Sequence, residues 1–276
     1  DLRKIVSTHL ERSSKKLDLQ LKQLKDTEKR DKYKVYGELL NTYGYQVTEG
    51  AKSVEVPNYY TGEMLTIPLD ETLSPLDNAK KYCARYNKLK RTFEALNTQT
   101  EETKAEMAHL QTIQAALAIA ESEDDLAQIR DELETYGYIR RKMNGKKKQK
   151  SKSKPFHYRS SDGFHIYVGK NNFQNDELTF KVANGNDWWF HAKGMPGSHV
   201  IVKTEGSELP DRTFEEAGRL AGYYSSGRDN EKIEIDYLQR KNVKKPKCAV
   251  AGYVIYYTNY SLTIHPDISG IEKISE

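Results

Sequence analysis

The sequence predicts an α+β protein: a long antiparallel helical coiled-coil rod with a β-hairpin tip, followed by a compact mixed α/β domain. Apolar residues recur at helical spacing through most of residues 1–141, whereas short β-branched and aromatic runs dominate residues 156–276. Hydrophobic content of 37% and charged content of 30% fit a solvated helical part joined to an ordinary folded domain. We therefore expect a rod at 1–141, a linker at 142–155 and an α+β domain at 156–276.

Residues 1–43 are predicted to form one helix of about 40 residues. They contain no proline and no glycine before Gly37. A polar helix of this length needs a partner, because isolated helices are only marginally stable in water. The alternating 4,3 spacing typical of a coiled-coil seam is held by Leu10, Ser14, Leu17, Leu21 and Leu24.

Residues 44–74 are predicted to be the tip, with strands at 53–56 and 64–67 joined as a hairpin. Ser74 is the expected N-cap and Pro75 the first residue of a returning helix. Ser122 is expected to cap a further short helix over residues 126–136. The seam of the returning helix has the phase of an antiparallel partner and comprises Tyr82, Tyr86, Leu89, Phe93, Leu96, Thr100, Thr103, Met107 and Leu110.

The excess positive charge of the chain lies in the linker, since the net charge is +4 and residues 144–154 hold six lysines and no acid. Such a run is expected to be disordered in isolation. It is either a solvated tether or a strap that binds phosphate groups through counterion release. The lysines are Lys146, Lys147, Lys148, Lys150, Lys152 and Lys154.

Residues 156–276 are predicted to form short strands around one helix at 213–224, whose apolar residues lie on one face. Strands are predicted at 164–168, 178–182, 188–191, 199–203, 233–237, 250–257 and 262–264. The segment from Gly163 to Lys170 does not match a phosphate-binding loop. The two glycines are separated by five residues where the motif has four, and the intervening residues are predicted to form a strand.

Residues 186–200 hold both tryptophans, two histidines and a Gly-Met-Pro-Gly turn. A metal site at Asp187, His191 and His199 is disfavoured, because the segment reads as a strand and lacks further ligands nearby. A hydrolase site at Ser198, His199 and Asp187 lacks a nucleophile turn. We therefore predict no catalytic residue, no metal and no cofactor.

Two interpretations of this segment remain. Buried, hydrogen-bonded groups that fix a turn would be Asp187, Gly197, Ser198 and His199. A surface that stacks on bases and contacts phosphate would use Trp188, Trp189, His191 and Lys193.

A second basic run follows a predicted strand at residues 240–247. It is either a solvated edge loop or a second phosphate contact. Its candidate RNA-binding residues are Arg240, Lys241, Lys244, Lys245 and Lys247, and Lys170 in the turn at 169–172 is a further candidate.

Residues 156–203 closely resemble the NFACT-R domain, and the N-terminal half resembles the middle coiled-coil region of the NFACT family. The matching motifs are 156–164, 168–172, 175–179, 187–191, 196–200, 242–245 and 252–254 in the domain, and 67–70, 73–75 and 78–82 where the helix returns. The resemblance points to the bacterial branch of the family, which comprises RqcH and fibronectin/fibrinogen-binding proteins of the FbpA and PavA type.

The resemblance implies a ribosome quality control factor that binds the large ribosomal subunit and tRNA. It would support C-terminal alanine tailing of stalled nascent chains, with the peptide bond made by the ribosome, so the chain itself is not expected to be an enzyme. The alternative that it implies is a surface adhesin for host fibronectin or fibrinogen. The family's N-terminal NFACT-N domain is expected to lie outside this sequence, which begins at Asp1.

Cys83 and Cys248 lie in different segments and are expected to be unpaired thiols in a reducing compartment. The sequence contains no apolar run of about 20 residues, the length that a membrane helix needs. We therefore expect a cytoplasmic protein without membrane insertion, with the cell surface as the location implied by the adhesin alternative.

Overall fold

The computed structural model describes residues 1–141 and 150–275. The described residues form two compact units, Ser13–Ala105 and Asp1–Arg12 with Glu106–Glu276. The α+β fold class predicted from the sequence is confirmed, because long helices and a hairpin precede a mixed domain with one large sheet. The predicted linker at 142–155 does not coincide with the division between these units, which falls inside helices.

The N-terminal helix is interrupted, so the single helix predicted over residues 1–43 is wrong in this detail. It consists of α1 (Leu2–Asp26), a 3₁₀ turn (Thr27–Lys29) and α2 (Arg30–Tyr43). The buried Thr27 hydroxyl donates to the carbonyl of Leu24 over 2.6 Å. This local bond competes with the regular helical ladder and accounts for the tightened turn.

In the unit Ser13–Ala105, the first helices pair with α3 (Pro75–Ile119) in antiparallel fashion. The Thr103 hydroxyl donates to the side-chain oxygen of Gln20 over 2.9 Å. Farther along, the Arg30 guanidinium lies 4.1 Å from the ring centroid of Phe93. A later residue of the first helices therefore meets an earlier residue of α3, so the two run antiparallel, as the sequence predicts.

The seam predicted for α3 is confirmed, because its positions are all buried or half-buried. The seam predicted for α1 is wrong at two of its five positions, since Ser14 and Leu21 are exposed. The buried positions beside Leu17 and Leu24 are instead Ser13, Gln20 and Thr27. The spacing of apolar residues alone does not locate a seam that contains polar residues. Gln20, for example, can be buried because its side chain is hydrogen-bonded to Thr103 of α3.

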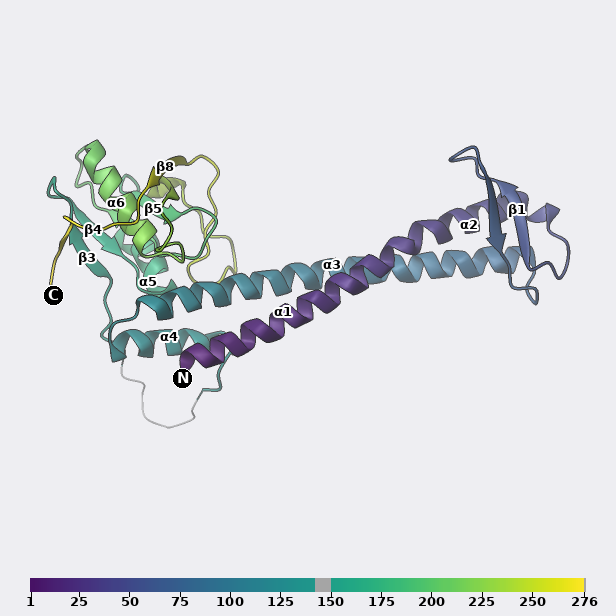
Figure 1. Cartoon of the computed structure of the whole chain (residues 1–276), viewed down its shortest axis with the longest axis horizontal. Coiled ribbons are helices and arrows are strands. Elements are labelled where there is room, and N and C mark those ends of the chain that lie inside the picture. Colours follow the sequence, from purple (N-terminus) through teal and green to yellow (C-terminus); the bar gives the residue numbers. More distant parts are fainter. Residues whose placement is uncertain (142–149, 276) are drawn as a thin grey trace. The chain divides into compact units, whose positions relative to one another are not determined.

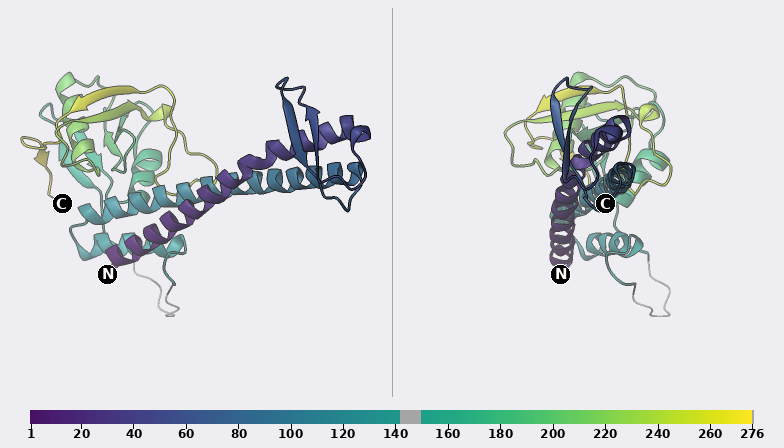
Figure 2. Two further views of the ribbon diagram at one scale, coloured as in Figure 1. Left: turned by 45° about the vertical axis from the view of Figure 1, so that its right-hand side comes forward. Right: turned by 90° about the vertical axis from the view of Figure 1, so that its right-hand side faces the viewer.

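The predicted hairpin is confirmed as β1 (Ser53–Pro57) and β2 (Met64–Pro68), which pair antiparallel. Val56 and Ile67 are fully buried and pack with Leu39 and Leu40 of α2. Figure 2 shows the hairpin beside the ends of α2 and α3. Ser74 caps α3 as predicted, because its hydroxyl accepts from the backbone N–H of Asp77 over 3.1 Å.

Within residues 150–275, seven strands form one antiparallel sheet in the order β8-β7-β5-β6-β4-β3-β9. Helix α6 (Asp211–Tyr223) packs on one face over the main apolar core (Figure 1). A smaller core covers the other face. The strands are β3 (Phe156–Arg159), β4 (His165–Val168), β5 (Trp188–Ala192), β6 (Val200–Val202), β7 (Ile233–Gln239), β8 (Tyr260–Ile264) and β9 (Glu272–Lys273).

Two predicted strands are wrong. Residues 178–182 form a π-helix, Leu178–Val182, that continues α5 (Asn172–Glu177) and closes with the bond from Ala183 N to Leu178 O. The alternation over these few residues was too short to distinguish a strand from a helix. Residues 250–257 form a loop with only a single bridge, Lys244 to Ile255. Strands β3 and β9 and helix α5 were not predicted.

The start of α1 and the end of α3 belong to the same unit as the sheet, together with α4 (Glu123–Thr135). Val6, Leu110, Ile113 and Leu133 are fully buried in the core that these helices share. Ser122 caps α4 as predicted, and its capping-box partner is Asp125.

Candidate nucleic-acid interface

Strand β5 places its two tryptophans on opposite faces of the sheet, because side chains alternate along a strand. Trp189 has no exposed surface and packs against His199 and Tyr256. Trp188 is partly exposed and packs on the face of α6. The predicted contact of Trp189 with RNA is therefore corrected, because a fully buried ring offers no face to a base.

The His191 and His199 rings lie beside Trp189, with centroids 5.6 Å and 5.1 Å from the indole. The carbonyl of Gly252 can only accept, so Nε2 of His199 donates to it and Nδ1 accepts from the Thr179 hydroxyl. Burial holds the pKa of His199 well below its ordinary value and lowers the pKa of His191. This pair lies on the face opposite Trp188.

The other residues of the predicted turn motif are held by hydrogen bonds to backbone and side-chain groups. The Asp187 carboxylate accepts from Lys203 Nζ over 2.6 Å and from the backbone of Thr204 and Asn184. Burial would raise the pKa of Asp187, but these hydrogen bonds outweigh burial and hold the pKa below its ordinary value. Nearby, the N–H of the buried Ser198 donates to the carbonyl of Tyr224, and Gly197 forms a bridge to Ser225.

Trp188 lies in an aromatic cluster with Phe214, Tyr237 and Tyr260, at centroid distances of 5.0, 5.8 and 6.1 Å. Among the described residues, two clefts flank it. The Phe214 cleft has a volume of about 500 Å³, and the Tyr260 cleft has a volume of about 400 Å³. Trp188 and Gln239 line both clefts, so they form a shared wall.

The predicted basic contacts divide into exposed and structural groups. Lys241, Lys244 and Lys247 are exposed, and none has a carboxylate at ion-pair distance within residues 1–141 and 150–275. Arg240 instead donates to the carbonyl of Thr179. Lys245 is bonded to Asp176 and to two carbonyls. The loop therefore offers three lysines to an anion, whereas its other two cations stabilise the fold.

The remaining predicted basic contacts do not join this surface. Lys193 follows β5 at the end away from Trp188 and pairs with Glu234 over 3.1 Å. Lys170 is mostly buried and pairs with Asp125 over 3.3 Å. Lys150, Lys152 and Lys154 are exposed. Lys146, Lys147 and Lys148 lie outside the described residues.

The turn at residues 169–172, in which Lys170 was a candidate RNA contact, docks the sheet domain on α3 and α4. The side chain of Asn171 donates to Gln128, and that of Asn172 donates to Thr112 and Glu132. These bonds span 2.7 to 2.8 Å. Sequence reasoning missed this contact, because an asparagine-rich turn gives no signal of the helix that it meets.

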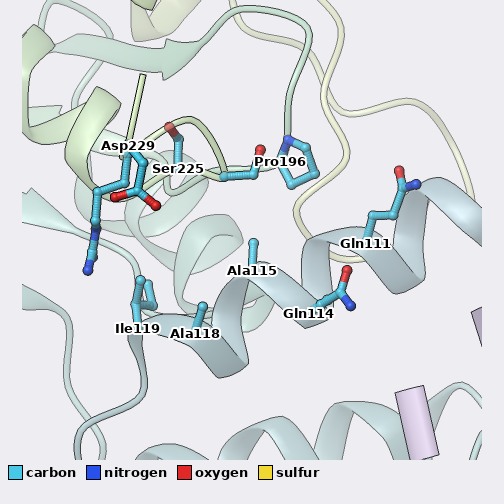
Figure 3. Close-up of a pocket in the computed structure, with 10 residues that line it drawn as sticks. Gln111, Gln114, Ala115, Ala118, Ile119, Pro196, Ser225 and Asp229 are labelled. Carbon is cyan, nitrogen blue, oxygen red and sulfur yellow. The ribbon is translucent and has the colours of Figure 1, made fainter. Parts of the chain in front are cut away.

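A larger cleft of about 560 Å³ lies between α3 and the loops that follow β5 and α6 (Figure 3). Gln111, Gln114 and Ala115 of α3 face Pro196 and Asp229 across it. It contains neither an aromatic stacking face nor a group of free cations among its lining residues. The aromatic clefts at Trp188 are therefore the better candidate for nucleic acid.

Within the described ranges, no group of three or more His, Cys, Asp or Glu side chains is placed to hold a metal ion. Among the same residues, no helix is both long and apolar enough to cross a membrane.

Comparison with family models gives two matches along the chain. The model of the NFACT N-terminal and middle domains matches residues 1–152, and the model of the NFACT protein RNA binding domain matches residues 154–255. The two ranges meet inside the predicted linker.

Curated relatives are similar over the full chain. The Rqc2 homolog RqcH of Streptococcus suis is 39% identical over 99% of this chain and 49% of its own length. The Rqc2 homolog RqcH of Bacillus subtilis is 34% identical over 100% of this chain and 49% of its own length. The chain thus spans about half the length of these relatives.

A solved structure has the same fold. The C-terminal part of the fibronectin/fibrinogen-binding protein from Streptococcus suis matches with a TM-score of 0.77 and 33% identity. The match covers 99% of this chain and 96% of that one. Family models along the chain, relatives over its full length and the shared fold agree, and the chain belongs to the NFACT family.

Proposed function

We propose that this chain is the coiled-coil and RNA-binding part of a cytoplasmic ribosome quality control factor. It would bind the large ribosomal subunit and tRNA and support C-terminal alanine tailing of stalled nascent chains in the full-length protein. Its contribution would be binding, with the ribosome making the peptide bond. The observation that carries the proposal is the match of residues 154–255 to an RNA-binding domain whose surface combines a partly exposed tryptophan with unpaired lysines.

The lysines at 241, 244 and 247 suit phosphate, because each exposed ammonium without a carboxylate partner can replace a counterion of the nucleic acid. Lys241 is also tied to the domain, since its backbone N–H donates to the carbonyl of Gly185 over 3.0 Å. A cation on this loop therefore stands close to the residues that precede Trp188.

The test is binding of the chain to large subunits and to tRNA at about 50 and about 200 mM salt. Affinity should fall with salt, and Lys241→Ser with Lys244→Ser should weaken binding and reduce the salt slope by about 1 to 2. The control pair, Lys181→Ser with Lys232→Ser, removes exposed lysines elsewhere on the domain. Binding without a salt slope, or equal loss from both pairs, would contradict the proposal.

The lysine-rich linker stays a predicted phosphate strap. Replacing its lysines with serine should weaken RNA binding in addition to the loss at residues 241–247. Binding that survives this replacement unchanged would leave the linker as a tether.

A second candidate function is adhesion to host fibronectin or fibrinogen, for which a cell-surface location would be required. It is supported by the name of the solved relative, a fibronectin/fibrinogen-binding protein with the same fold. Surface plasmon resonance of this chain against both host proteins tests it. No binding at micromolar concentration would exclude it for these residues.

A further inference from the structure

Trp188 and Gln239 are direct partners in the register of β5 and β7, and both line the Phe214 cleft and the Tyr260 cleft. A single cross-strand pair thus separates two neighbouring cavities. Volumes of about 500 and 400 Å³ fall within the range of small-molecule sites, about 300–1,000 Å³. Each cleft is therefore large enough for a flat heterocycle.

The walls of the clefts suit bases better than phosphates. Each cleft has aromatic walls, Trp188 with Phe214 in one and Trp188 with Tyr260 in the other. No lysine or arginine is among the lining residues, and the one charged lining side chain is the carboxylate of Glu208. A phosphate would meet no cation in either cleft and would be repelled by Glu208 in the Phe214 cleft, whereas a neutral base can stack on the rings of both.

Side-chain amides supply the polar groups of the site. Within the part of the chain that the structure describes, the amides of Asn186, Gln239 and Asn242 make no hydrogen bond. Each can both donate and accept, which matches the edge of a base. Asn259 is held in place by its bond to Asp236 over 2.9 Å. The clefts thus combine rigid stacking faces with uncommitted donors and acceptors.

We propose that the two clefts bind two unpaired nucleobases of a single RNA strand, one on each side of the Trp188–Gln239 wall. The inference rests on the proposed RNA-binding function and specifies its ligand. The backbone between the two bases would pass the exposed Lys241, which lies between Gln239 and Asn242 in the chain. Paired bases cannot enter, because a duplex buries its base faces in the stack.

The experiment measures binding of the full chain to a labelled single-stranded RNA of mixed sequence and to a duplex that contains the same strand, by fluorescence anisotropy. The single strand should bind more tightly at equal salt. Tyr260→Ser should weaken single-strand binding about five- to a hundredfold, since stacking contributes strongly per base. Asn242→Ala should also weaken it, because the variant removes an amide that can bond to the edge of a base. The salt slope should stay unchanged, because neither variant removes a phosphate contact.

Tyr257→Ser is the matched control, because Tyr257 is 84% exposed and lies outside both clefts, whereas Tyr260 is 60% exposed and lines one. Both substitutions are at exposed positions and should leave the fold intact, which circular dichroism checks. Tryptophan emission should also be quenched in part by the single strand and not by the duplex, because Trp188 is partly exposed whereas Trp189 is fully buried.

Equal binding of duplex and single strand, or equal behaviour of Tyr260→Ser and Tyr257→Ser, would overturn the assignment of the clefts. If Lys241→Ser with Lys244→Ser still weakens binding in that case, the RNA-binding function stands without the base clefts. If the chain binds neither RNA, the proposed function and the inference both fail. If a free nucleoside binds as tightly as the single strand, the clefts form a mononucleotide site and not a two-base site, and the proposal is overturned.

Discussion

Asn172 and Glu132 meet in a buried position, where Nδ2 of Asn172 donates to Oε2 of Glu132 over 2.8 Å. The same oxygen accepts from Nε2 of His109 over 3.0 Å. Asn172 begins α5 of the sheet domain, whereas Glu132 belongs to α4 and His109 to α3. One carboxylate oxygen therefore links three helices, through side chains that are all withdrawn from water.

Asn172→Ala should lower the free energy of unfolding by about 1–3 kcal/mol, because it removes a buried donor that bonds to Thr112 of α3 and Glu132 of α4. Urea unfolding followed by circular dichroism measures the change. Asn184→Ala removes an exposed asparagine side chain in the same domain and should change stability by less than about 0.5 kcal/mol. Equal midpoints for the two variants would show that the buried amide contributes nothing.

Gly252→Ala should be more destabilising than Gly270→Ala. Both glycines have φ of +81°, so both variants carry the same backbone penalty, about 1–2 kcal/mol. An added Cβ at Gly252 would lie 2.3 Å from Oδ1 of Asn172, whereas nothing lies within 4 Å at Gly270. Thermal unfolding of the two variants isolates the steric part, and equal losses would mean that Asn172 moves freely.

Stability should fall as pH drops below about 6.5, the ordinary pKa of histidine. The folded-state pKa values of His199, His191 and His157 are lowered chiefly by burial, so the unfolded chain binds protons that the folded chain excludes. The stability is therefore complete above this pH and is lost below it, by up to about 1.4 kcal/mol per pH unit for each histidine.

Denaturant unfolding between pH 8 and pH 5 measures this slope, and His199→Gln should flatten it. Asp187 does not contribute to the slope between pH 8 and pH 5. Because its pKa is lowered in the folded state, the stability that it contributes is lost only in more acidic solution. An unchanged slope in His199→Gln would assign the effect to the other histidines.

Gly37 and Cys83 should show strong coupling in a double-mutant cycle. A Cβ added at Gly37 would lie 2.7 Å from Sγ of Cys83. Gly37→Ala alone should destabilise the helical unit despite the better helix propensity of alanine, about 1 kcal/mol. In the Cys83→Ala background the sulfur is gone, so the same change should stabilise it. Thermal unfolding of the four proteins tests this, and additive effects would contradict it.

Local patterns predicted the parts of the fold that depend on local interactions. Ser74 and Ser122 identified helix starts correctly, because a cap bonds to residues two or three positions away. The seam of α3 was predicted correctly because its aromatic and leucine spacing is regular. The phase on α1 was missed because Gln20 is buried by a partner 83 residues away in the chain.

The candidate site was only half predictable for a related reason. Strand alternation requires Trp188 and Trp189 to face opposite ways, but it does not indicate which face is covered. That depends on the loop that carries Tyr256, which the sequence suggested was a strand. The lysines of residues 240–247 were found from charge density, which does not distinguish the exposed Lys244 from Lys245, whose ammonium is bonded to Asp176 and to two carbonyls.

The docking of α4 has a practical consequence for recombinant fragments. Asp125 completes the capping box of α4 and also accepts from Ser153, which precedes β3, and from Lys170 of the sheet domain. A fragment that begins at residue 156 would expose the amides of Asn171 and Asn172 and remove the carboxylate that neutralises Lys170. We expect such a fragment to be poorly stable. A fragment that begins near Glu106 retains α4 and Asp125, and adding residues 1–12 would be needed to restore Val6 to the core of the helices.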